Sequence, residues 1–309
     1  MKATNAWRGY LLALLAATLW ATLGLFGKSL YRYDVDPVLL ITLRASIASL
    51  TLGVILLIFR PGLLRIRLDD LPFLLFYGLV GVALNYACYF MALKWTTVTT
   101  AVFLLYLYPA LVVLGAALFL GERITPLKLM ALVVALTGSA LVAQAFNLAD
   151  LALNLTGVLY SLGAALTMAV YTLLGKYGLK RYSGWTLIFY GIGFAALAFF
   201  LWQGKRLEIA LRYPWQAWLL ILGVAWIPTL IAYSSFTLSL GFIEASHAAI
   251  ITYLEPVLAA GLAYFLLAER LDILQGVGAV LILTGIMALQ LKEGLPPTKE
   301  VKIGESVNS

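Results

Sequence analysis

Two ionisable side chains interrupt long apolar stretches of this sequence, and each could bind a charged group. Arg44 lies in the apolar run that begins at Val38, and Glu255 lies in the run that begins at Ala245. If such runs cross a membrane, a charge at their centre costs about 2.5–3.5 kcal/mol or more, so it should face protein or water. Arg44 could therefore anchor an anionic or carboxylate-bearing solute. Alternatively, it could tether its helix to backbone carbonyls or to a neighbouring helix.

Glu255 is followed directly by Pro256. A proline within a helix removes one backbone hydrogen bond and frees a carbonyl one turn earlier, which here lies near Thr252. Burial favours the uncharged form of a carboxyl group, so Glu255 could take up and release a proton. The alternative is a protonated or paired glutamate that only bonds the kinked helix.

Polar and aromatic residues gather in six of the apolar runs, where they could line a shared cavity. A cavity with aromatic walls and few charges suits a small amphipathic solute. For any single tyrosine or tryptophan, packing or a place in an interfacial belt is the alternative. The candidate substrate-binding residues are Trp20, Arg44, Asn85, Tyr86, Tyr89, Tyr108, Tyr171, Trp226, Tyr233, Thr252 and Glu255.

The composition places these runs in lipid. Of the 309 residues, 63% are hydrophobic and only 11% are charged, and the mean hydropathy is +0.99. Soluble domains are about half apolar and about a quarter charged. A chain that spans lipid must form helices or closed barrels, and apolar runs of about 20 residues indicate helices.

The charged and reactive residues exclude several classes of function. The formal net charge is +7, but the basic residues lie mostly in short joints between apolar runs, so we expect no nucleic-acid partner. A single cysteine, Cys88, excludes an internal disulfide framework, and a single histidine, His247, excludes a histidine metal cluster. The sequence has no nucleotide-binding glycine loop, no Ser-His-Asp set and no metal-ligand spacing. We therefore expect neither enzyme activity nor a cofactor.

The hydropathy pattern predicts an all-α membrane protein with ten transmembrane helices, several of which have a proline near the first turn. The predicted spans are Arg8–Leu30, Val38–Phe59, Leu71–Leu93, Val98–Leu120, Leu127–Gln144, Leu155–Leu179, Gly184–Gln203, Trp215–Leu240, Ala245–Leu267 and Ile273–Gln290.

The chain contains an internal repeat. Ala101–Val142 recurs 147 positions later as Ala248–Leu289 without a gap, and 14 of the 42 aligned positions are identical. A proline, a Glu-Arg pair and a Thr-Gly pair match in one register, which two apolar chains rarely share by chance. An offset of 148 extends the match back to Gly9 and Gly157. Each copy holds five predicted spans, and an odd number inverts the second copy across the membrane, as in secondary transporters.

Basic residues in the joints predict that both termini are cytoplasmic. With the N-terminus inside, 13 lysines and arginines fall on the cytoplasmic side and 7 on the outer side, and such residues concentrate inside. We expect five-helix repeats at residues 8–144 and 155–290, followed by a disordered cytoplasmic tail at 291–309. The protein should be multi-pass in the inner or plasma membrane, in contact with lipid. Small residues in the fifth span, Ala131, Ala135 and Ser139, suit close helix packing or a homodimer contact.

Two motifs occur once in each copy of the repeat. They are Leu107-Tyr108-Pro109 with Leu120-Gly121-Glu122-Arg123, and Leu254-Glu255-Pro256-Val257 with Leu267-Ala268-Glu269-Arg270. These motifs resemble the EamA-like family of the drug/metabolite transporter superfamily, in which an arginine is often found where Arg44 stands. The resemblance covers about residues 8–290. It implies a ten-helix inner-membrane carrier, usually an exporter of metabolites or amino acids, whose cavity is lined by helices 1, 3, 4, 6, 8 and 9.

These features together predict a secondary active transporter that exports small organic metabolites, amino-acid-like or amphipathic, by alternating access. Coupling to protons is one option for its energy source, and Glu255 is the residue that would carry it. A membrane scaffold or sensor that keeps the fold without transport is the alternative. A closed and fully apolar interior would favour that alternative.

Overall fold

The computed structural model describes residues 6–145, 154–267, 270 and 272–293, and the regular structure within these ranges is entirely helical. Nine helical stretches there are long and apolar enough to cross a membrane, and a shorter apolar helix covers Pro126–Val142. The prediction of an all-α membrane protein is confirmed. Residues 291–293 of the predicted tail belong to the last helix, and the rest of that tail lies outside the described residues.

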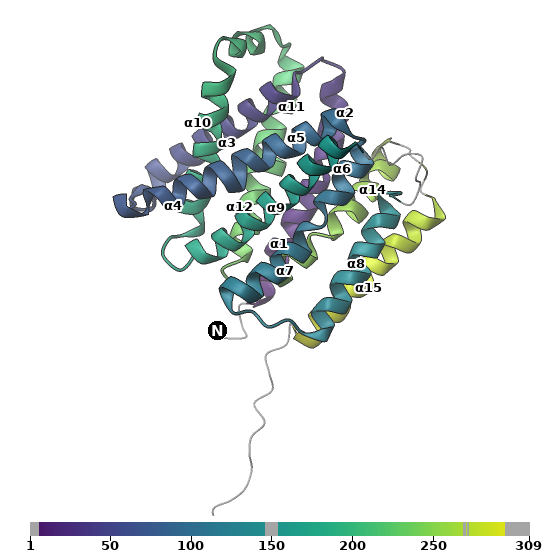
Figure 1. Cartoon of the computed structure of the whole chain (residues 1–309). Coiled ribbons are helices and arrows are strands. Elements are labelled where there is room, and N and C mark those ends of the chain that lie inside the picture. Colours follow the sequence, from purple (N-terminus) through teal and green to yellow (C-terminus); the bar gives the residue numbers. More distant parts are fainter. Residues whose placement is uncertain (1–5, 146–153, 268–269, 271, 294–309) are drawn as a thin grey trace, which may run out of the picture.

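The helices of the described residues are shown in Figure 1. The α-helices are α1 Ala6–Ala21, α2 Leu23–Tyr31, α3 Pro37–Phe59, α4 Leu71–Phe76, α5 Asn85–Trp95, α6 Val98–Leu105, α7 Tyr108–Gly115, α8 Pro126–Val142, α9 Leu155–Gly178, α10 Gly184–Gln203, α11 Trp215–Val224, α12 Ala232–Ser239, α13 Ala245–Ile251, α14 Leu254–Leu267 and α15 Ile273–Glu293. Short 3₁₀ helices are η2 Pro61–Leu64, η3 Leu68–Asp70 and η6 Gly204–Arg212. Three π-helical segments are η4 Tyr77–Leu84, η5 Ala116–Leu120 and η7 Ala225–Ile231.

Several helices begin at a side-chain cap. Asp36 accepts a hydrogen bond from the Leu39 amide at 2.8 Å before α3, and Thr125 accepts one from the Lys128 amide at 3.1 Å before α8. Such caps satisfy amides that have no partner inside the helix. A proline occupies the first turn of both helices, where its missing amide hydrogen costs nothing.

Two long helices are interrupted where the sequence has a proline in each copy of the repeat. The chain breaks between α6 and α7 just before Pro109, and between α13 and α14 just before Pro256. A proline cannot donate a backbone hydrogen bond, so the preceding turn is released from regular pairing. These breaks set the positions of Tyr108 and Thr252.

Two of the π-helical segments occupy matching places in the repeat. Leu84 ends η4, and its counterpart at an offset of 147, Ile231, ends η7. A π-helical turn holds one more residue than an α-helical turn, so it rotates the helix that follows. Pro228 lies inside η7. The helices that follow these segments, α5 and α12, carry Tyr86 and Tyr233.

The helices pack in pairs that join the N-terminal half of the chain, residues 6–145, to the C-terminal half, residues 154–293. The extensively packed pairs are α8 with α15, α5 with α9, α3 with α10 and α1 with α12. In Figure 1, α8 and α15 lie side by side at the lower right. A Cβ atom on Gly138 would lie 2.6 Å from the Gly278 carbonyl oxygen, and one on Gly278 would lie 2.6 Å from the Gly138 carbonyl oxygen. The helix axes therefore approach closely, as small residues allow in membranes.

The small residues of the fifth predicted span face this contact. Ala131, Ala135 and Ser139 are fully buried, and Cβ atoms on Gly285 of α15 would meet the backbone of Ala131 and Ala135. The ridge therefore serves packing within the chain.

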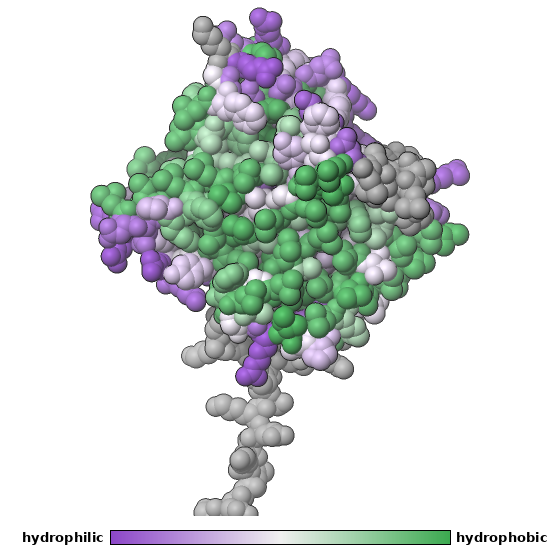
Figure 2. Space-filling view, in the orientation of Figure 1, coloured by the Kyte–Doolittle hydropathy of each residue, from purple (hydrophilic) through white to green (hydrophobic). Residues whose placement is uncertain are grey.

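The surface separates into an apolar belt and polar ends. Figure 2 shows hydrophobic residues over the middle of the visible face, with hydrophilic residues gathered at the top, around η6, and at the left, near the start of α4. Large apolar side chains are exposed on many of the described helices, among them Leu57, Phe76 and Leu118. Such a belt is the surface that a lipid bilayer covers.

Candidate functional site

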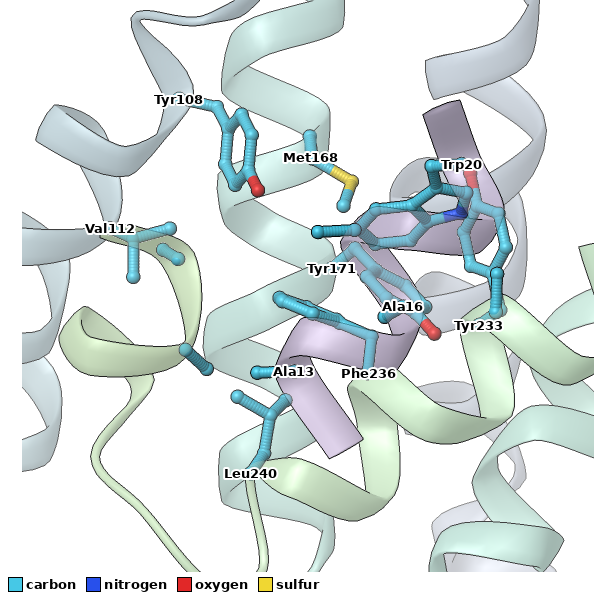
Figure 3. Packing of buried hydrophobic residues seen from close by; sticks show 14 of the residues in the cluster. Ala13, Ala16, Trp20, Tyr108, Val112, Met168, Tyr171, Tyr233, Phe236 and Leu240 are labelled. Carbon is cyan, nitrogen blue, oxygen red and sulfur yellow. The ribbon is translucent and has the colours of Figure 1, made fainter. Parts of the chain in front are cut away.

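Aromatic rings from four helices meet at the centre of the bundle. The Tyr233 ring of α12 lies 5.2 Å from the Trp20 ring of α1, 5.6 Å from the Tyr171 ring of α9 and 5.9 Å from the Tyr86 ring of α5, centroid to centroid. All three contacts are edge-on, which is a favoured aromatic geometry. Figure 3 shows Trp20, Tyr171 and Tyr233 together with Phe236. We call Trp20, Tyr86, Tyr171, Tyr233 and Phe236 the aromatic cluster.

Sequence reasoning missed one ring beside this cluster, that of Tyr77. It is stacked on Tyr171 with a centroid distance of 5.1 Å and is fully buried. Glycines make room for it, since a Cβ on Gly191 would lie 2.8 Å from the Tyr77 ring and one on Gly175 would lie 3.4 Å from its hydroxyl oxygen. Glycine spacing in the neighbouring helices is the signal that could have found it.

Arg44 of α3 lies against the aromatic cluster. Its Cζ atom is 4.2 Å from the centroid of the Tyr86 ring, within the range of a cation–π interaction. Its Nε atom is buried and has no hydrogen-bond partner among the described residues. A tether from Nε to a backbone carbonyl is therefore not what holds this side chain.

A second set of polar contacts connects the two helix breaks. The hydroxyls of Tyr108 and Thr252 are hydrogen bonded to each other, and the Tyr253 hydroxyl donates to the Tyr106 carbonyl oxygen at 2.8 Å. That carbonyl lies at the break between α6 and α7, where regular helical pairing ends. The two copies of the repeat thus contact each other through residues that the prolines release.

Glu255 lies one residue before Pro256 in the first turn of α14 and is half-buried. The charges of Glu255 and Arg44 both act on Tyr89 of α5, so both ionisable groups lie in the neighbourhood of this tyrosine. The interior therefore holds one acidic and one basic side chain near a wall of tyrosines. It is not a fully apolar interior.

Two other predicted binding residues have roles in packing. The Asn85 amide nitrogen donates to the Ala164 carbonyl at 2.8 Å and to the Thr167 hydroxyl at 3.3 Å, which joins α5 to α9. Trp226 is 43% exposed, and its indole nitrogen donates to the Thr51 hydroxyl at 3.0 Å. The structure does not bring Trp226 into the aromatic cluster.

One end of the bundle carries polar contacts between the two halves of the chain. We call it the Glu244 end, defined by Glu122, Lys128, Lys176 and Glu244. The buried Lys128 pairs with Glu244 and also donates to the Arg123 carbonyl at 2.9 Å. The Lys176 ammonium donates to the carbonyls of Leu240 and Ile243 at 2.6 and 2.8 Å.

Glu122 caps a helix of the other half at this end. Its carboxylate accepts hydrogen bonds from the amides of Ala245 and Ser246 at 2.6 and 3.1 Å and from the Ser246 hydroxyl. A carboxylate at a helix N-terminus is favoured by the unpaired amides and the helix dipole. Glu269, which matches Glu122 in the repeat, lies outside the described residues.

The same end carries a second tie between the halves. Asp70 accepts hydrogen bonds from Arg181 and Tyr182, each at 2.7 Å. Burial, together with the bond to the Asp70 carboxylate, raises the pKa of Tyr182. A surface cavity of about 820 Å³ at this place is lined by Arg65, Ile66, Arg67, Asp69, Asp70, Arg181 and Tyr182. At this end, too, Tyr10 and His247 share a hydrogen bond of 3.1 Å.

Helices with an apolar outer surface and a polar, aromatic interior that includes intramembrane charges are the architecture of a membrane transporter. The comparisons with known proteins agree. The family model of the EamA-like transporter family matches residues 7–144 and 155–290. The chain therefore belongs to the EamA-like transporter family, and it is a multi-pass membrane protein of the cell membrane.

Individual relatives cover most of the chain. An "Uncharacterized transporter" of Archaeoglobus fulgidus is 29% identical over 216 residues, which are 68% of this chain and 74% of the relative. "Pseudopaline exporter CntI" of Pseudomonas aeruginosa is 25% identical over 287 residues, which are 91% of this chain and 95% of the exporter. One crystal structure matches the fold with a TM-score of 0.78 at 22% identity, covering 92% of this chain and 96% of that one.

Proposed function

We propose that this protein is a secondary active transporter that exports small organic metabolites, amino-acid-like or amphipathic, by alternating access. The observation that carries the proposal is the place of Arg44 against the aromatic cluster, together with Glu255 beside a helix break and near enough to Tyr89 for its charge to act on that residue. Charges inside a membrane bundle are costly, and where they persist they mark solute or ion pathways.

Alternating access needs two units that move relative to each other. We propose that the units are two inverted five-helix repeats, residues 8–144 and 155–290, with both termini in the cytoplasm. The shorter helix α8 is then the fifth of ten spans and completes the first repeat. The double match of the family model and the pairing of helices between the two halves support this arrangement. The solute would then bind among the proposed site residues at the interface of the repeats.

The Glu244 end would face the cytoplasm in this arrangement, and its contacts would close that side. Lys128–Glu244, Glu122–Ser246 and Asp70–Arg181 each join the two halves. Export would require these contacts to open so that a cytoplasmic solute can enter. They would close again when the solute leaves on the opposite side.

Glu255 is the group that we propose for proton coupling. A half-buried carboxyl group next to a helix break can exchange a proton when the cavity opens to water. Tyr89, Tyr106 and Tyr108 lie near enough to Glu255 for its charge to act on them.

The test uses purified full-length protein in proteoliposomes, with a panel of radiolabelled amino acids and monocarboxylates. We expect exchange of at least one panel solute, and a pH gradient should accelerate its net flux. Glu255→Gln should keep exchange and lose the response to the pH gradient, whereas Glu208→Gln, in the exposed η6, should keep both. A Glu255→Gln protein that still responds to the gradient would remove the proton role. No flux of any panel solute would favour a scaffold or sensor.

A further inference from the structure

Five buried polar atoms at or near the aromatic cluster have no hydrogen-bond partner among the described residues. They are Trp20 Nε1, Arg44 Nε, Tyr77 Oη, Tyr86 Oη and Ser234 Oγ. Trp20, Tyr77 and Tyr86 are each at most 5% exposed. Native proteins leave few buried polar atoms unpaired, because such an atom loses its bonds to water and gains none in return. A group of such atoms in one region therefore calls for a ligand.

Trp20, Arg44 and Tyr86 belong to one site. The rings of Trp20 and Tyr86 both contact Tyr233, and Arg44 lies over the Tyr86 ring. The three side chains come from α1, α3 and α5, and Tyr233 of α12 contacts two of them, so both halves of the chain contribute.

Several other polar side chains of the site are already paired. The Tyr171 hydroxyl is bonded to Thr237 at 2.6 Å, Tyr108 is bonded to Thr252, and the Asn85 amide is bonded to α9. These side chains are therefore weaker candidates for a bond to a ligand than Trp20, Arg44 and Tyr86.

The side chains of Trp20, Arg44 and Tyr86 can all donate hydrogen bonds. An indole N–H and a guanidinium can only donate, and a tyrosine hydroxyl can donate as well. A ligand group that pairs with all of them must supply several acceptors. Because Arg44 is positively charged, a carboxylate satisfies both the hydrogen bonds and the charge. An ammonium group satisfies neither.

We propose that Trp20, Arg44 and Tyr86 form a subsite for the carboxylate group of the transported solute. The rings of the aromatic cluster cover the apolar part of the same solute. This assignment rests on the proposed function, and it restricts the solutes to carboxylate-bearing molecules.

The test measures binding of four related probes to the purified full-length protein by calorimetry. The probes are phenylalanine, phenylalaninamide, 3-phenylpropionate and phenethylamine, which differ in whether they carry a carboxylate and an amine. We expect phenylalanine to bind at least about tenfold more tightly than phenylalaninamide, and 3-phenylpropionate at least about tenfold more tightly than phenethylamine, since charge-assisted hydrogen bonds to the carboxylate are lost.

Two substitutions locate this preference. Arg44→Gln should reduce the tenfold preference to less than about twofold. Trp20→Phe keeps a ring and removes the indole donor, so it should weaken binding of phenylalanine about fivefold and leave phenylalaninamide unchanged. Trp226→Phe removes an indole donor that is bonded to Thr51 outside the cluster, and it should change neither affinity.

The subsite is overturned if phenylalaninamide binds as tightly as phenylalanine, if neither carboxylate probe binds, or if Trp226→Phe has the same effect as Trp20→Phe. Flux measurements separate this result from the proposed function. Flux that does not favour carboxylate-bearing solutes over solutes without a carboxylate would support transport and reject the subsite. Carboxylate binding without flux of any solute would retain the subsite and reject transport.

Discussion

The helices α6 and α13 are matching segments of the repeat, yet they are packed very differently. All seven residues of α13 are buried, whereas only Thr100 and Ala101 are buried in α6. The helices themselves are similar in length and apolar character. The difference lies in what precedes them and what contacts their first turns.

Charged residues from both halves of the chain contact the start of α13. Glu244 precedes α13 and pairs with Lys128, and Glu122 caps its first amides. At the offset of 147, Thr97 takes the place of Glu244 and Gln275 takes the place of Lys128. Thr97 caps its own helix through the Thr100 amide at 3.2 Å. Two helices at matching places in the repeat can thus differ in burial because a few residues at their ends make different contacts.

The largest effect is expected from breaking the Lys128–Glu244 pair. Lys128→Gln introduces the residue type of its repeat counterpart and should destabilise the closed Glu244 end by about 1.5–3 kcal/mol, because it removes the charge-assisted hydrogen bonds of a buried lysine, whereas the 46% exposed Glu244 can be rehydrated. The measurement is maleimide labelling of Ala249→Cys within α13, in a Cys88→Ala background. Labelling should accelerate at least about tenfold.

The exchanged pair Lys128→Glu with Glu244→Lys should restore slow labelling of this reporter. Lys94→Gln changes an exposed lysine at the other end and serves as the control. Equal labelling rates for Lys128→Gln and Lys94→Gln would show that the ion pair does not hold α13 closed.

The next effect concerns two glycines that also match in the repeat. Gly138→Ala should lower stability by about 1–3 kcal/mol, since its Cβ would lie 2.6 Å from a backbone oxygen of α15. Gly285→Ala should cost less, because the nearest atom is a backbone oxygen at 3.1 Å. Thermal unfolding in detergent measures both. Gly276→Ala, which has open space around it, is the control, and an equal loss in all three would contradict the close approach.

A smaller effect is expected from transferring the ion pair to the other end. Thr97→Glu combined with Gln275→Lys places the residue types of Glu244 and Lys128 at their counterparts. A partly exposed pair stabilises by about 1 kcal/mol, so labelling of Val102→Cys in α6 should slow about fivefold. Either substitution alone should not slow labelling, and a double variant that behaves like the single ones would show that side-chain charge does not explain the comparison.

The smallest effect is expected at the cap of α13. Ser246→Ala removes the hydroxyl bond to Glu122 but leaves two backbone amides on that carboxylate, so the loss should be about 0.5–1 kcal/mol. Labelling of the Ala249→Cys reporter should rise about threefold. Thr99→Ala, at the matching position, should leave the reporter unchanged. If Thr99→Ala changed the labelling rate of the reporter more than Ser246→Ala did, the cap of α13 would not explain its burial.

Much of the fold could be predicted from the sequence, because apolar runs and prolines act locally. The runs predict where helices begin and end, and Pro109 and Pro256 predict the interruptions before them. The contacts across these interruptions could not be predicted. The bond between Tyr108 and Thr252 depends on how two distant helices are placed, and hydropathy does not contain that placement.

The candidate site was only partly predictable for a related reason. Arg44 and Glu255 stand out because charges are rare in apolar runs, and the structure places both near Tyr89. Trp226 has the same appearance in the sequence as Trp20, but it lies in η7, where the wider turn changes which way side chains point. Lys128 and Glu244 look like ordinary joint residues until the fold brings them together.

The direction in which the proposed binding residues point depends on the number of residues in the two π-helical segments η4 and η7. Deletion of one residue from Tyr77–Leu84 would let regular α-helical pairing resume and would turn the following helix by about 100°, carrying Tyr86 away from Arg44. The same deletion in Ala225–Ile231 would turn Tyr233 away from Trp20. Relatives could therefore acquire a different solute preference through a single-codon insertion or deletion, with every residue type in the site unchanged.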